Sequence, residues 1–101
     1  MRQIEKEMIA AIKNGRNFGK SNTAVVFNGS VADIYLFGNL IATVTYNNGR
    51  FAGRFTLAGY NTVTTRSRLN ALNIGVYCKD FTPYVGKRSI NKHEWISFEN
   101  K

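Results

Sequence analysis

The sequence has very little of the residues that build disulfides and metal centres. Its 101 residues include one cysteine, Cys78, and one histidine, His93. A lone cysteine cannot close an intrachain disulfide, and such sparing use of cysteine suits a reducing compartment. A metal site in a protein needs several ligands at recognisable spacings, and neither residue has such neighbours. We therefore expect no disulfide, no metal site and no cofactor.

Acidic residues are also scarce. Six aspartates and glutamates stand against 14 lysines and arginines, which gives a formal net charge of +8. The acidic residues are scattered, so no carboxylate pair for acid–base chemistry is indicated. No nucleophile elbow is present, and no third group at a recognisable position would orient Cys78 and His93 for catalysis. We expect a protein that is not an enzyme.

Long apolar runs are missing as well. None approaches the roughly 20 residues that a membrane-spanning helix needs. The first 14 residues mix charged side chains into their apolar ones, unlike a secretory signal. We expect a cytoplasmic protein with no membrane partner.

The residues that are present favour one folded domain over residues 1–101, because 44% of them are hydrophobic. Apolar residues at helical spacing predict a helix over residues 1–14, with Gly15 after its end. Four β-rich runs follow, separated by Asn-Gly or Gly-Asn pairs that are typical of hairpin turns. These runs are Thr23–Phe27, Val31–Phe37, Leu40–Tyr46 and Phe51–Ala58. They predict a four-stranded antiparallel meander.

The second half of the chain predicts three more elements. Residues 62–73 favour a second helix that begins at a threonine cap, and residues 76–85 favour a fifth strand. Asn91 and Glu94 have the spacing of a capping box, which favours a short C-terminal helical turn. A strand at the same place is almost equally compatible with the sequence. The predicted fold class is α+β: N-terminal helix, four-stranded meander, second helix, fifth strand and a short C-terminal turn or helix.

The basic residues indicate where a polyanion would bind. Arg50 and Arg54 alternate with the apolar residues of the fourth predicted strand, so they project from its solvent face. Arg66 and Asn70 share a polar stripe on the second helix, while Arg68 borders the apolar stripe and favours a structural role. Arginine forks fit phosphate, and asparagine can read base edges.

A second basic group flanks the glycine-containing loop after the first helix. Arg16 and Lys20 stand there and could contact phosphate together with free backbone amides. The predicted binding residues are therefore Arg50, Arg54, Arg66, Asn70, Arg16 and Lys20.

Two stretches resemble small uncharacterised proteins of tailed bacteriophages. One is Leu36–Ala42, which contains a Gly-Asn turn, and the other is Thr62–Ala71, which contains Thr-Thr-Arg-Ser-Arg-Leu-Asn. The matching residues cover about two-fifths of the chain. The resemblance implies a phage origin, hence the cytoplasm of a bacterial host, and no particular activity.

The leading hypothesis is a phage accessory protein that binds nucleic acid or a host nucleoprotein, because a strongly basic surface attracts polyanions. The alternative is a phage-encoded inhibitor or adaptor that binds an acidic host protein, in the manner of anti-restriction or anti-CRISPR proteins. A third interpretation is a self-associating structural component, since exposed strand edges can pair. The sequence does not predict the oligomeric state.

Overall fold

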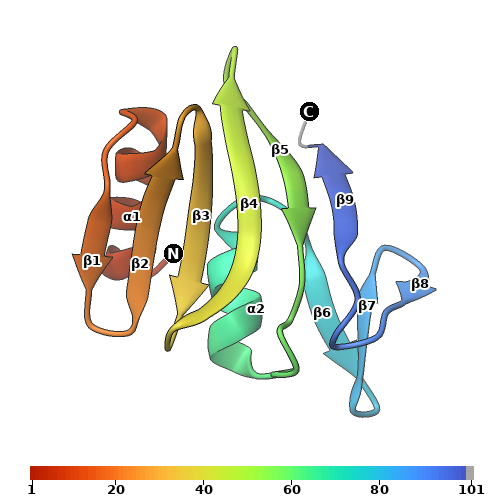
Figure 1. Cartoon of the computed structure of the whole chain (residues 1–101). Coiled ribbons are helices and arrows are strands. Elements are labelled where there is room, and N and C mark those ends of the chain that lie inside the picture. The colour runs from red at the N-terminus through yellow and green to blue at the C-terminus, as the bar shows by residue number, and fades with distance from the viewer. Residues whose placement is uncertain (100–101) are drawn as a thin grey trace.

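The computed structural model describes residues 1–99 and is built around one large antiparallel sheet (Figure 1). Six strands lie in the order β1-β2-β3-β4-β5-β9, and each neighbouring pair is antiparallel. The strands of this sheet are β1 (Phe18–Lys20), β2 (Thr23–Asn28), β3 (Val31–Leu36), β4 (Asn39–Asn47), β5 (Arg50–Phe55) and β9 (Ile96–Glu99). A second sheet has three strands, β6 (Val76–Lys79), β7 (Thr82–Val85) and β8 (Arg88–Ser89).

Both helices pack against the same face of the large sheet (Figure 1). Helix α1 (Gln3–Lys13) lies over β1 and β2, and helix α2 (Val63–Asn70) lies against β4 and β6. Their apolar side chains meet the inward side chains of the strands in one core. This core includes Met8, Ile12, Val25, Ile34, Val44, Phe55, Leu57, Leu69 and Leu72.

Alternation along the strands decides which side chains enter that core. In β3, Ala32, Ile34 and Leu36 are buried. In β5, Phe51 and Phe55 are buried while the two arginines are exposed. The second face of the sheet is covered by neither helix. Among residues 1–99, no helix is long and apolar enough to cross a membrane.

The predicted architecture was wrong. The chain is β-rich, with a six-stranded and a three-stranded sheet, rather than a four-stranded meander with helices. Strand β1 lies where the sequence predicted a polar loop, and it pairs with β2 through a short turn at Ser21 and Asn22. Three residues are too few to show the period-two alternation by which a strand is recognised.

The predicted fifth strand is two strands joined by a turn. Asp80 and Phe81 adopt positive φ angles of 51° and 64° between β6 and β7. Such turns favour asparagine or aspartate followed by glycine, so Asp80 followed by a phenylalanine was only a weak turn signal.

The C-terminal segment is a strand rather than a helical turn. The hydrogen bond of a capping box does form, because Asn91 N–H donates to the Glu94 carboxylate at 3.2 Å. The chain then extends, and Ile96 pairs with Phe55 of β5. Pairing with the free edge of β5 gives hydrogen-bond partners to the β9 backbone groups that face it, whereas a single helical turn would leave most of its backbone groups unsatisfied.

Candidate functional site

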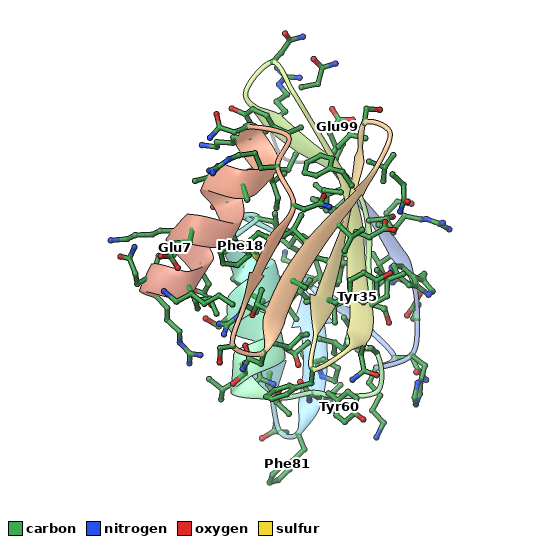
Figure 2. The ribbon with its side chains drawn as sticks, turned by 60° about the vertical axis from the view of Figure 1, so that its left-hand side comes forward. Glu7, Phe18, Tyr35, Tyr60, Phe81 and Glu99 are labelled. Atoms are coloured by element: carbon green, nitrogen blue, oxygen red, sulfur yellow. The ribbon has the colours of Figure 1, made fainter. Side chains whose placement is uncertain are left out.

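One side of the six-stranded sheet is covered by neither helix and lies outside the core. Figure 2 shows α1 and α2 on one side of the strands and the other side free. The strand registers place one row of alternating side chains on this surface, which we call the open face. The open face consists of Val26, Asp33, Tyr35, Thr43, Thr45, Arg50, Ala52, Arg54, Ser97 and Glu99.

Arg54 lies on the open face one strand in from the β9 edge of the sheet. Its strand partners are Thr43 on β4 and Ser97 on β9. Its guanidinium stands over the ring of Trp95, 5.7 Å from the ring centroid. Trp95 directly precedes β9, so the pairing of β9 with β5 brings the tryptophan to the arginine. A cation–π contact of this kind holds the guanidinium near the ring and leaves its N–H groups able to donate to another group.

Arg50 lies at the end of the open face where β4 and β5 are joined. It pairs with Asn47 across the Asn48-Gly49 turn. Its exposed side chain borders a shallow hollow of about 460 Å³ that Thr45, Asn48 and Glu99 also line. Arg50 and Arg54 therefore lie on one strand and one face, two residues apart in the outward row, as the alternation predicted.

The open face is not uniformly basic. Asp33 and Glu99 lie on it beside the two arginines, and the Asp33 carboxylate accepts a hydrogen bond from the Asn28 side chain at 2.6 Å. Two positive and two negative charges nearly cancel locally. Long-range attraction of a polyanion would therefore come from the net charge of the whole chain, +8.

The structure places Arg66 and Asn70 on the other side of the sheet from Arg50 and Arg54. Both belong to α2, which packs on the covered face. The Arg66 guanidinium donates to the Asn61 side-chain oxygen at 2.5 Å. The Asn70 amide makes two hydrogen bonds to Val76, donating to its carbonyl at 2.9 Å and accepting from its N–H at 2.6 Å. The side chain of Asn70 thus fixes the start of β6.

Replacing Asn70 with alanine is expected to destabilise the protein by about 1–3 kcal/mol, because both backbone groups of the buried Val76 lose their partner. Thermal unfolding followed by circular dichroism measures the loss. Asn47→Ala is the matched control, since the Asn47 side chain is exposed at the end of β4 and makes no hydrogen bond among those of residues 1–99. Equal melting temperatures for Asn70→Ala and wild type would show that these bonds contribute nothing.

Arg16 and Lys20 lie at opposite ends of the β1 region. Arg16 follows α1, and its backbone N–H donates to the Ala11 carbonyl. Lys20 forms a solvent-exposed ion pair with Glu7 at 2.9 Å. The six predicted residues therefore do not form one surface: Arg50 and Arg54 share the open face, while Arg66 and Asn70 line one hollow on the α2 side.

The Thr-Thr-Arg-Ser-Arg-Leu-Asn motif has structural contacts along most of its length. The Thr62 hydroxyl accepts from Thr65 N–H and caps α2. Ser67 and Arg68 both donate to the carboxylate of Glu5 in α1, at 2.5 and 2.8 Å. Arg68 is 4% exposed, which agrees with the structural role that its position beside the apolar stripe favoured.

Sequence reasoning missed Trp95 and the outward row of β3 and β4. Tyr35 and Thr43 alternate with buried residues, and that alternation was readable from the sequence. Trp95 could be placed only after residues 96–99 were assigned as a strand and paired with β5. Within the described part of the chain, no three His, Cys, Asp or Glu side chains gather closely enough to hold a metal ion.

Fold and site together define a small, basic, β-rich protein with two helices on one face of its main sheet and the other face free. The chain belongs to the Kyanoviridae Gp96 protein family, whose model matches residues 1–101. This confirms the tailed-bacteriophage origin that the resemblance predicted. No curated protein and no solved structure matches the chain.

Proposed function

We propose that this phage protein binds nucleic acid, alone or within a nucleoprotein, through the open face and without catalysis, in the cytoplasm of the bacterial host. The observation that supports this most is the placement of Arg50 and Arg54. Both are exposed, both lie on the uncovered side of the sheet, and neither forms an ion pair with any residue from 1 to 99.

The chemistry of the open face fits a phosphate backbone. A guanidinium donates paired hydrogen bonds to phosphate oxygens, and the cation–π contact with Trp95 holds the Arg54 guanidinium in place on the open face. Thr43 and Thr45 lie beside it and offer hydroxyl groups of the kind that contact phosphate and sugar. Backbone contacts of this type position a nucleic acid and do not read its sequence.

A single strand fits this surface better than a duplex. The open face is a sheet surface, with no helix or protruding ribbon to enter a major groove. It offers instead the rings of Tyr35 and the 41%-exposed Trp95, and aromatic rings on a sheet stack well on unpaired bases. The proposed contact is therefore Arg50 and Arg54 on the phosphates with Tyr35 and Trp95 beside the bases.

The test is fluorescence anisotropy of the protein with labelled single- and double-stranded DNA and RNA at two salt concentrations. We expect the single strands to bind more tightly, with an affinity that falls steeply as salt rises. In the double variant Arg50→Gln/Arg54→Gln, the slope of log affinity against log salt should fall by about 1–2, because about one phosphate contact is lost per arginine.

The matched control removes two exposed cations elsewhere. Lys87→Gln/Lys92→Gln makes the same change in net charge, beside the small sheet rather than on the open face. If both double variants weaken binding equally, net charge acts alone and the open face is not the site. If Arg66→Gln has the larger effect, the contact lies on the α2 side. An absence of binding to all four polymers would refute the proposal.

A further inference from the structure

Three large aromatic side chains stand in solvent at one end of the molecule, and the open face does not include them. Phe37 lies in the β3–β4 turn, Tyr60 in the loop before α2, and Phe81 in the β6–β7 turn. Their exposed fractions are 70%, 53% and 97%. All three connections lie at the lower edge of Figure 1, and Figure 2 shows Tyr60 and Phe81 at the same end. We call these three residues the aromatic end.

Contacts between the connections support this grouping. Phe37 and Tyr60 line one groove of about 380 Å³, which Leu36 and Ile41 also line. Asn61, the neighbour of Tyr60, donates its amide to the Phe81 carbonyl at 3.5 Å. Phe37 and Tyr60 therefore border a mostly apolar groove, and the Phe81 turn lies next to it, joined through Asn61.

The backbone positions of the two phenylalanines are unfavourable for such residues. Phe37 has a φ of 52° before Gly38, and Phe81 has a φ of 64° after Asp80. Turns with these angles favour asparagine or aspartate followed by glycine, because a bulky side chain is strained at positive φ. The Asn48-Gly49 turn of the same protein has the favoured pair, at 52° and 78°.

For neither phenylalanine is the backbone strain offset by burial of the ring. A strained residue in a core gains apolar burial, but these two rings remain mostly in water. Backbone strain together with exposed apolar surface is characteristic of sites that contact a partner. An asparagine in place of Phe37 and a glycine in place of Phe81 would relieve the backbone strain of the two turns. The phenylalanines therefore contribute to contact with a partner rather than to the fold.

The lining and the charges indicate what that partner is. Leu36 and Ile41 give the groove an aliphatic lining, which suits an apolar side chain rather than a phosphate or a polar base edge. Lys79 and Asp80 both adjoin Phe81, and Arg66 is bonded to Asn61 beside Tyr60, so two cations and one carboxylate lie near the aromatic rings. A second copy of the chain would also carry a net charge of +8 and be repelled.

We propose that the aromatic end docks an acidic segment of another protein, which inserts an apolar side chain into the groove between Phe37 and Tyr60. Carboxylates on that segment meet Lys79 and Arg66, Phe37 and Tyr60 contact the inserted side chain, and Phe81 contacts a neighbouring part of the segment. The two surfaces share no residue but adjoin, because Tyr35 of the open face and Phe37 line one hollow. Peptide binding and nucleic-acid binding are therefore measured separately for each variant.

The test selects short random peptides, displayed on yeast, for binding to the wild-type protein. Enriched peptides are expected to combine aspartate or glutamate with a leucine or phenylalanine. They should bind the double variant Phe37→Asn/Phe81→Gly at least about tenfold more weakly, as measured by anisotropy. Tyr60→Ala, which removes one wall of the groove, should weaken the same peptides.

Folding does not confound this comparison. The double variant introduces the residue pairs that both turns favour, so its melting temperature should equal or exceed that of wild type. Val26→Thr is the matched control, because Val26 is an exposed apolar residue on the open face and should leave peptide binding unchanged.

Each other outcome overturns the proposal. Peptides that bind wild type and the double variant equally would show that the phenylalanines make no contact. Enrichment without acidic residues would remove the role of Lys79 and Arg66. Loss of nucleic-acid binding in the double variant would assign the aromatic end to nucleic acid, and a dimer in sedimentation that the double variant abolishes would assign it to a second copy.

Discussion

Arg68→Ala is expected to lower the free energy of unfolding by about 3–5 kcal/mol, because it leaves the buried charge of Glu5 without its partner. The Arg68 guanidinium donates to Glu5 at 2.8 Å, to the Thr23 hydroxyl at 2.9 Å and to the Asn22 side chain at 3.2 Å. It therefore joins both helices to the β1–β2 turn. In a domain of this size such a loss lowers the melting temperature by more than about 12 °C.

The double variant Glu5→Leu/Arg68→Met separates the loss of the pair from the exposure of a lone buried charge. Replacing both ions with apolar side chains of similar size removes the unpaired charge, so the double variant should be more stable than Arg68→Ala. Surface pairs serve as the comparison: Lys20→Ala breaks an exposed pair with Glu7 and should cost less than about 1 kcal/mol. If Arg68→Ala and Lys20→Ala had the same melting temperature, the buried ion pair would contribute no more to stability than the exposed one.

The same carboxylate makes stability depend on pH. Burial raises the pKa of Glu5, but hydrogen bonds from Ser67, from the Arg2 backbone and from Arg68, with the charge of Arg68, outweigh it and hold that pKa below its ordinary value of 4.5. A carboxyl whose pKa is lower in the folded state stabilises the fold above its unfolded pKa, and this contribution is lost as the pH falls through the folded pKa. The loss of stability on acidification should therefore begin below pH 4.5 and be smaller in Glu5→Gln.

The sequence predicted the local elements better than their assembly. Strands β2 to β5 overlap the four runs that the Asn-Gly and Gly-Asn turns separated, because such turns report directly on backbone angles. Strand β9 could not be recognised in this way. Residues 96–99 are extended because the edge of β5 is free to pair with them, and that edge exists only after the meander has folded.

In the candidate site too, local features could be predicted from the sequence and the assembly of distant segments could not. Arg50 and Arg54 were placed correctly on the solvent side of a strand, since period-two alternation is a local property. The separation of Arg66 from them was not readable, because nothing in residues 62–73 says which face of the sheet the second helix covers. The roles of the two phenylalanines were not recognised. The turn after the second run was predicted at Gly38-Asn39, one residue late, and the turn at Asp80-Phe81 was missed, so both phenylalanines were counted within strands.

Gly53→Ala is expected to destabilise the protein by about 3–5 kcal/mol through a clash with the neighbouring strand. Gly53 lies within β5 at a φ of 152°, a conformation that residues with a side chain rarely adopt. A Cβ atom there would lie 2.0 Å from the Thr43 carbonyl oxygen and 3.1 Å from the Val44 Cα. These atoms belong to the backbone of β4 and cannot rotate away, so β4 and β5 must separate.

Gly19→Ala provides the matched control for this prediction, because Gly19 also lies in a strand but nothing would contact its Cβ within 4 Å. Its free energy of unfolding should change by less than about 0.5 kcal/mol. Urea denaturation measures both variants, and the separation of β4 from β5 should also disturb Thr43 and Arg54, which pair across them. Nucleic-acid binding by Gly53→Ala should then weaken even at temperatures where the variant is folded. Equal stabilities for the two glycine variants would show that β4 and β5 can adjust to a side chain at this position.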